Sequence, residues 1–153
     1  MESFIQEGDN DNKSVMIINN LVLDRNLPTG GRAKVEASRA YISKQGKYAS
    51  LDNCSIRYVA NNIDVLATAK KCVYIEDKKI TLRSSIKGKI NDVSFFGDNN
   101  SIFEFYITKG YGIMEGGVKI SEKGNSVEAG KLEIFKEKRA LYFSKGVRVK
   151  YEN

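Results

Sequence analysis

Turn-forming residues recur at short intervals along the chain, and this spacing constrains the fold more than any other feature. Most turns lie roughly 7 to 16 residues apart, which suits short strands joined by hairpins and leaves little room for helices of average length. We expect turns at Pro28-Thr29-Gly30-Gly31, Gln45-Gly46, Asn61-Asn62, Asp77-Lys78, Gly97-Asp98-Asn99-Asn100, Lys109-Gly110, Gly116-Gly117, Lys123-Gly124-Asn125, Glu137-Lys138 and Lys145-Gly146.

Between the turns, apolar residues alternate with polar ones. This period of two places one apolar face on each strand. The chain has one proline, so long uninterrupted ladders are possible. The sequence therefore predicts an all-β sandwich or roll. The clearest runs are Ile63, Val65, Ala67, Ala69; Ile80, Leu82; Phe103, Phe105, Ile107; and Val147, Val149, Tyr151.

A short internal repeat supports a stacked architecture. The segment Val35-Glu36-Ala37 recurs as Val127-Glu128-Ala129, and Ala67-Thr68-Ala69 lies about a third of the way between them. Stacked strand pairs of this kind cover one another's apolar faces and leave two open ends. Glu36 and Glu128 stand between inward-facing residues, so both are expected to face solvent.

Length and composition exclude several classes of protein. The 153 residues are enough for one domain; we place it at residues 14–153, after a polar, flexible leader at residues 1–13. No apolar run approaches the length of a membrane-spanning helix. The chain has no histidine, which removes the commonest general base and most zinc sites. We expect no enzymatic activity, no metal and no cofactor.

Two cysteines, Cys54 and Cys72, flank the turn at Asn61-Asn62. A simple hairpin about that turn places Cys54 opposite Ala69, three residues from Cys72. This offset argues against a direct cross-strand disulfide.

The apolar strand faces are the first candidate site. They have two interpretations: a filled core, or an apolar trough between two sheets that takes up acyl chains at roughly 0.8 kcal/mol per buried methylene. Periodicity does not separate the two. The residues are Val35, Ala37, Leu51, Val65, Ala67, Leu82, Phe103, Phe105, Ile107, Leu132, Ile134, Leu141 and Phe143.

The net charge of +6 favours a polyanionic partner. Lysines and arginines at turns and strand rims could meet phosphates at the mouth of a trough, although lysine at strand edges also serves solubility. They are Lys70, Lys71, Lys78, Lys79, Lys87, Lys89, Lys136, Lys138, Arg139, Lys145, Arg148 and Lys150.

A single-stranded nucleic-acid module is the alternative from another class, because strand tyrosines could stack on bases. Tyrosine is also an ordinary strand residue, and no RNP-like or GxxG signature is present. We therefore expect no nucleic-acid partner. The tyrosines concerned are Tyr41, Tyr48, Tyr58, Tyr74, Tyr106 and Tyr111.

The last strand, from Gly146 to Tyr151, has little chain after it to cover its free edge. Such an edge invites strand addition by another chain, unless it is already paired internally. Val147, Val149 and Tyr151 are the candidate partner residues.

Several segments together resemble one known family. They are Val35-Glu36-Ala37-Ser38-Arg39-Ala40-Tyr41, Leu51-Asp52-Asn53-Cys54-Ser55-Ile56, Thr68-Ala69-Lys70-Lys71-Cys72-Val73-Tyr74, Lys79-Ile80-Thr81-Leu82, Val127-Glu128-Ala129 and Tyr142-Phe143-Ser144-Lys145-Gly146-Val147-Arg148-Val149. Their order and spacing, from about Ser14 to Tyr151, resemble the LptA and LptC (OstA-like) proteins of lipopolysaccharide transport. The opening strand, Ile17 to Leu21, the Thr68-Ala69 segment and the basic C-terminal end are more similar to LptC.

The resemblance implies a β-jellyroll of two facing sheets with open ends, whose interior carries the acyl chains of lipopolysaccharide. It implies a place in the periplasmic bridge between the inner and outer membranes. The partners it implies are an inner-membrane LptBFG-type transporter at the N-terminal edge and an LptA-like protein at the C-terminal edge. LptC-type proteins usually carry an N-terminal membrane anchor, and this chain is expected to lack one. An LptA-like soluble bridge subunit is the alternative within the family.

Overall fold

The computed structural model describes residues 16–136 and 140–151. The expected leader at residues 1–13 and the expected turn at Glu137-Lys138 lie outside the described residues. The strands are β1 (Met16–Asn26), β2 (Arg32–Ile42), β3 (Tyr48–Ala60), β4 (Ile63–Ile75), β5 (Lys79–Arg83), β6 (Lys87–Ile90), β7 (Val93–Gly97), β8 (Ile102–Tyr106), β9 (Tyr111–Glu122), β10 (Asn125–Phe135), β11 (Ala140–Ser144) and β12 (Arg148–Lys150).

The strands form one antiparallel meander. Its order is β1-β2-β3-β4-β5-β8-β9-β10-β11, with β6 and β7 pairing between β4 and β9, and β12 pairing with β10. Three long strands of the meander are therefore each broken into two short ones. The pairs of short strands are β5 with β6, β7 with β8, and β11 with β12. Because every link is a local hairpin or a break in a strand, the sheet forms from neighbours in sequence.

A row of residues folds this sheet lengthwise. Asn20, Ser38, Asn53 and Lys70 are left out of the ladders that join β1 to β4, and Ser84–Ser85 separate β5 from β6. Asn20 and Asn53 have φ angles of 58° and 48°, a left-handed conformation that asparagine tolerates and that bends a strand. We call this row the fold line.

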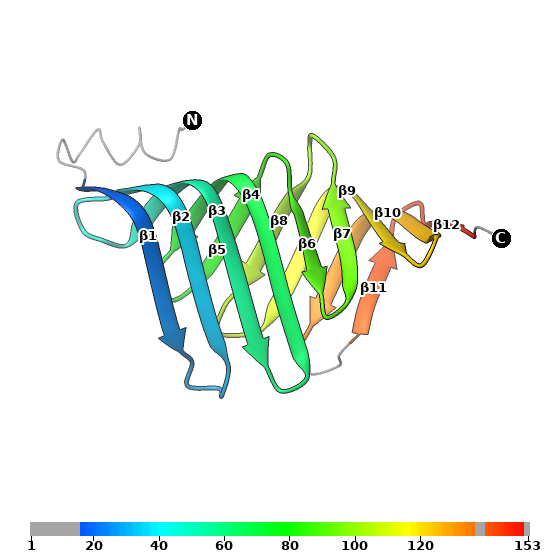
Figure 1. The fold of residues 1–153 in the computed structure, drawn as a ribbon, viewed down its shortest axis with the longest axis horizontal. Helices are drawn as coiled ribbons and strands as arrows, with labels where there is room; N and C mark the ends of the chain where they lie inside the picture. Colours follow the sequence, from blue (N-terminus) through cyan, green and yellow to red (C-terminus); the bar gives the residue numbers. More distant parts are fainter. Residues whose placement is uncertain (1–15, 137–139, 152–153) are drawn as a thin grey trace.

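The fold line divides the sheet into two facing layers. The β5 layer comprises β5, β8 and β11 with the halves of β1–β4, β9 and β10 that align with them. The β6 layer comprises β6, β7 and β12 with the remaining halves. Figure 1 shows the long strands β1 to β4 curving between the layers, with β5 and β8 passing behind. The predicted all-β roll with facing sheets is confirmed.

Burial explains why the long strands stay amphipathic across the fold line. In β2, Ala33, Val35 and Ala37 are buried, and the pattern then shifts by one residue so that Ala40 is buried next. The extra residue, Ser38, takes up the shift, so the same face points inward on both sides. The side opposite the fold line, where the hairpin turns of the two layers lie, is the open side.

Two local expectations were wrong. Gly116 and Gly117 were expected to form a turn but lie inside β9, with φ angles of 93° and 116°. Such angles suit glycine and let β9 bend between its two ladders without ending. The last strand was expected over Gly146–Tyr151, but β12 covers three residues. Lys145 and Gly146 have positive φ angles and form a bend before it.

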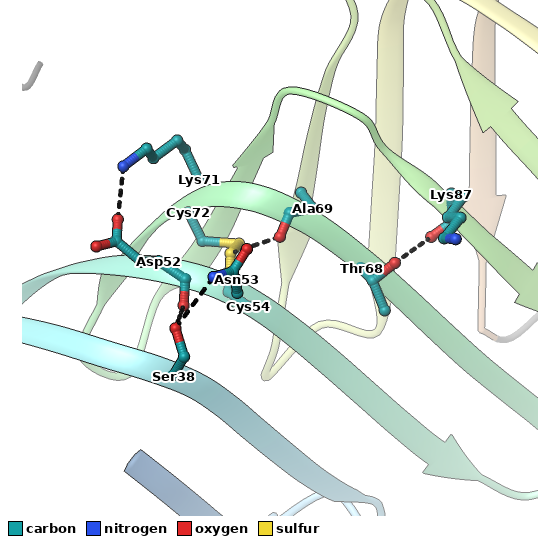
Figure 2. Close-up of a disulfide and its surroundings, with 9 residues drawn as sticks. All are labelled: Ser38, Asp52, Asn53, Cys54, Thr68, Ala69, Lys71, Cys72 and Lys87. Carbon is teal, nitrogen blue, oxygen red and sulfur yellow. Dashed lines mark hydrogen bonds and ion pairs between the residues drawn. A yellow bond between two sulfur atoms is a disulfide. The ribbon is translucent and has the colours of Figure 1, made fainter. Parts of the chain in front are cut away.

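Cys54 and Cys72 form a disulfide, which corrects the argument made from hairpin register (Figure 2). Cys54 does lie opposite Ala69, as expected. The fold line passes between the two cysteines, however, and brings their Cα atoms to 6.2 Å. The expected register is that of a flat hairpin, whereas the halves of β3 and β4 on the two sides of the fold line face each other. The disulfide therefore joins the two layers beside the fold line.

Candidate functional site

The predicted trough residues all belong to the interior between the layers. Two of them, Leu141 and Phe143, are half-buried and pack against the core. The buried ones are Val35, Ala37, Leu51, Val65, Ala67, Leu82, Phe103, Phe105, Ile107, Leu132 and Ile134. Their contact with lipid stays a prediction.

Aromatic rings fill the middle of this interior. Tyr58 of the β6 layer packs on Phe105 of the β5 layer with ring centroids 5.0 Å apart. Phe95 and Phe103 form a second pair across the layers at 5.7 Å, and the rings of Phe103 and Phe105 are 6.3 Å apart. We call these four residues the aromatic block. The block holds the two layers together and is a packed core.

The interior opens at its β1 end. A pocket of about 300 Å³ lies there between the layers, at the small end of the range for ligand sites. None of the predicted trough residues lines it. Its lining residues are Leu21, Leu23, Arg25, Ile42, Gly46, Tyr48, Ala49, Tyr74, Glu76 and Asp77. We call it the β1-end pocket. The apolar run Leu21-Val22-Leu23 is the sequence signal that could have found the strand that lines it.

An ion pair between Arg25 and Asp77 crosses the open side at this pocket. Arg25 belongs to the β6 layer, and Asp77 lies in the turn between β4 and β5 of the other layer. Hydrogen bonds to Asp77 and then to Tyr74 raise the pKa of Arg25. Both charged side chains remain accessible, at 39% and 61% exposure, so the pair is a weak and readily exchanged link.

The two edges of the meander carry exposed apolar side chains. β1 pairs with β2 and β12 with β10, and no other described strand pairs with either of them. At the C-terminal edge Val147, Val149 and Tyr151 are exposed, Tyr151 by 74%. Along β1, Met16, Ile17 and Val22 are exposed. Among the described strands, β12 has one unpaired side over three residues and β1 has one over 11 residues. Partner binding at the C-terminal edge stays a prediction.

The tyrosines of the nucleic-acid alternative are divided between the interior and the outer face, and the expectation of no nucleic-acid partner stays a prediction. Tyr58 and Tyr74 are buried and point between the layers. Tyr106 and Tyr111 stack on the outer face, with centroids 5.9 Å apart. Burial, followed by a hydrogen bond to Glu133, raises the pKa of Tyr111 to about 12.

The basic residues are divided between ion pairs and open solvent. Lys71 pairs with Asp52, Lys79 with Glu104, and Lys145 with Glu115. Lys70 and Lys87 line one groove of about 600 Å³ along the fold line, and Lys136 lines a separate cleft on the open side. Lys138 and Arg139 lie outside the described residues. Among the residues that the structure describes, no helix is long and apolar enough to cross a bilayer.

Two facing antiparallel layers with open ends define a β-jellyroll. No protein-family model matches the chain, and no curated protein matches its sequence. A solved structure with the same fold is that of LptH from Pseudomonas aeruginosa, described as the LptA-homologous periplasmic component of the lipopolysaccharide transport device.

The likeness to LptH covers 85% of this chain and 99% of LptH, with a TM-score of 0.60 and 12% sequence identity. At this identity the likeness shows the fold. The jellyroll expected from the family resemblance is therefore confirmed as an architecture.

Proposed function

We propose that this chain binds lipopolysaccharide without covalent chemistry and passes it along a periplasmic bridge of jellyroll proteins. The observation that carries the proposal is a pocket between two facing layers at one end of the roll, with apolar walls and a charged rim. Leu21, Ala49 and Tyr74 belong both to its lining and to the buried apolar core. The resemblance of the sequence motifs and the shared fold with LptH point to the same class of cargo.

The β1-end pocket suits the end of an acyl chain. Leu21, Leu23, Ile42 and Ala49 give it apolar walls, and Ala49 leaves room that a larger residue would fill. Each buried methylene group contributes about 0.8 kcal/mol. Further entry requires the layers to separate at the aromatic block, because its rings pack against one another across the layers, with centroids 5.0 and 5.7 Å apart.

The disulfide supports a periplasmic location. Disulfides form and persist in oxidising compartments, which include the bacterial periplasm. Cys54 and Cys72 are buried, and the bond joins the layers beside the interior. The location itself is part of the proposal.

The two free edges support a bridging role. β1, of 11 residues, pairs with β2 alone among the described strands, and its other edge would meet the inner-membrane transporter. The C-terminal edge with Val147, Val149 and Tyr151 would meet an LptA-like partner by strand addition. The LptC-like role suggested by the sequence stays a prediction, and an LptA-like soluble bridge subunit fits the same fold.

Native mass spectrometry of the full chain tests the proposal. The ligands are lipopolysaccharide, its de-acylated form and a short single-stranded DNA. We expect retention of the acylated form alone. Retention of DNA in place of the lipid, or equal retention of the de-acylated form, would overturn the proposal.

Two matched variants assign the site. Ala49→Phe places a ring in the β1-end pocket, whereas Leu66→Phe places the same ring on the outer face of β4, where Leu66 is exposed. We expect Ala49→Phe to lose at least about tenfold in lipid affinity, a cost of 1.4 kcal/mol, and Leu66→Phe to bind normally. Equal lipid affinity of the two folded variants would mean that the lipid does not bind in the β1-end pocket.

A further inference from the structure

A second cleft lies on the open side, between the turn Leu27–Gly31 of the β6 layer and the turn Ile107–Gly110 of the β5 layer. Its volume is about 340 Å³, close to the lower limit of small-molecule sites. A space of this size suits a monosaccharide with one substituent, not a polymer. We call it the turn cleft.

The polar groups of the turn cleft are donors suited to an anion. Lys109 and Lys136 line it together with the hydroxyls of Thr29 and Thr108, and no carboxylate among the described residues does so. Neither lysine forms an ion pair with a described acidic residue. Two lysines without a carboxylate partner among the described residues, beside two hydroxyls, favour a phosphate group. The Lys109 ammonium rests 5.8 Å from the centroid of the Tyr106 ring at the edge of the cleft. The β1-end pocket differs, since Glu76 and Asp77 both line it.

A buried hydroxyl without a partner stands behind the floor of the cleft. Tyr58 is fully buried, and its hydroxyl has no hydrogen-bond partner among the described residues. It lies against Gly110, where a β-carbon would come within 2.6 Å of the hydroxyl oxygen. Buried polar groups are rarely left unpaired unless they serve a site or bind a solvent molecule. This hydroxyl does not line the cleft; it stands behind Gly110 as an unpaired donor.

An aromatic wall lies at the outer rim of the cleft, because Tyr111 faces outward from β9. Tyr111 and Phe135 line it with ring centroids 5.1 Å apart. The Tyr111 hydroxyl donates to Glu133 at 2.6 Å, which holds the ring in place and engages the neighbouring carboxylate. An aromatic surface beside hydroxyl groups suits a ring that has an apolar face and polar edges, as a sugar has.

We propose that the turn cleft binds a phosphate monoester carried on a sugar ring. Lys109 and Lys136 bind the phosphate, Thr29 and Thr108 bond to sugar hydroxyls, and the aromatic wall contacts the ring. The ligand is either a soluble sugar phosphate or the phosphorylated saccharide headgroup of a lipid. The second source rests on the function proposed above, whereas the site itself does not.

Nuclear magnetic resonance titration of the full chain tests the site with glucose 1-phosphate, glucose and inorganic phosphate. We expect glucose 1-phosphate to bind at least about fivefold more tightly than either part alone. Lys109→Gln and Lys136→Gln should each weaken it by about fivefold, the effect of one exposed charged contact. Lys89→Gln, an exposed lysine on β6, should leave it unchanged. Tyr58→Phe, which keeps the buried ring, should fold and bind more weakly.

Equal weakening by Lys89→Gln would overturn the site, because it would mean attraction to net charge alone. Equal affinity for phosphate and glucose 1-phosphate would overturn the sugar part. Lipopolysaccharide and its phosphatase-treated form then distinguish the sources. A preference for the phosphorylated lipid that Lys109→Gln abolishes supports a headgroup, and sugar phosphate binding without that preference supports a soluble ligand. Loss of all lipid binding beside intact sugar phosphate binding would count against the transport proposal only.

Discussion

The middle of the roll and its β1 end have the same backbone architecture but opposite interiors. In the middle, the aromatic block fills the space between the layers, and Tyr58, Phe95, Phe103 and Phe105 have no exposed surface. At the β1 end, aliphatic and alanine side chains leave a pocket of about 300 Å³. The layers are held there by the Cys54–Cys72 disulfide at the fold line and by one ion pair on the open side.

The middle of the roll therefore supplies most of the stability of the fold, and the β1 end supplies the space that a ligand could occupy. The aromatic block contributes most through buried apolar area, so it resists opening. The β1 end has a covalent link on one side and an exchangeable link on the other, so it opens on the open side at low cost. A ligand between the layers would therefore enter at the β1 end, and the aromatic block sets how far it goes.

The largest expected effect comes from shortening a ring of the aromatic block. Phe105→Ala should lower the free energy of unfolding by about 3 to 5 kcal/mol, since it removes a fully buried ring and leaves a cavity. Leu23→Ala in the half-exposed wall of the β1-end pocket should cost about 1 kcal/mol. Urea denaturation with unchanged slopes measures both values. Equal losses of unfolding free energy in the two variants would mean that the middle of the roll is no more stabilising than its β1 end.

Removal of the disulfide should have the next largest effect. Cys54→Ser combined with Cys72→Ser should cost about 2 to 4 kcal/mol, through the loss of a crosslink between residues 18 apart. Hydrogen exchange should speed up first in β2 to β4, with β8 and β9 around Phe103 still protected. Uniform loss of protection would mean that the disulfide does not act on the β1 end in particular.

The fold was largely readable from the sequence because its elements are local. Alternating apolar residues and short turns identify the strands, and the repeat Val35-Glu36-Ala37 with Val127-Glu128-Ala129 marks where strands approach the bend. Ser38 and Gly130 follow the two copies directly. Asn20, Asn53 and Gly116–Gly117 are residue types that tolerate the φ angles of the bend, but Ser38 and Lys70 are ordinary strand residues whose phase shift shows only in the burial pattern.

The disulfide and the β1-end pocket could not be predicted for the same physical reason. Both depend on contacts between layers, which exist only once the sheet has folded along its length. Period-two patterns identify an inward face but not the side chain opposite it, so Ala49 and Leu23 looked no different from core residues. The ion pair of Arg25 with Asp77 likewise joins residues 52 apart in sequence.

A smaller effect is expected from opening the open side. Asp77→Asn should change the free energy of unfolding by less than about 1 kcal/mol, because the pair with Arg25 is exposed. It should nevertheless speed lipid entry, since the link across the pocket is weakened. Stopped-flow measurement of lipid uptake at low salt checks this, with Asp64→Asn as the control, because Asp64 pairs with Arg57 within one layer. Equal rates in both variants would leave the pair without a role in entry.

The smallest expected effect compares two buried tyrosines that differ in their hydroxyls. Tyr58→Phe removes an unpaired group in the middle, so it should leave the free energy of unfolding unchanged or raise it by up to about 1 kcal/mol. Tyr74→Phe at the β1 end removes a bond to Arg25 and should cost about 0.5 to 1.5 kcal/mol. Both rings keep their packing, so urea midpoints report the hydroxyls alone. A loss of stability in Tyr58→Phe would mean that this hydroxyl is satisfied in solution, and that the middle of the roll holds a polar partner.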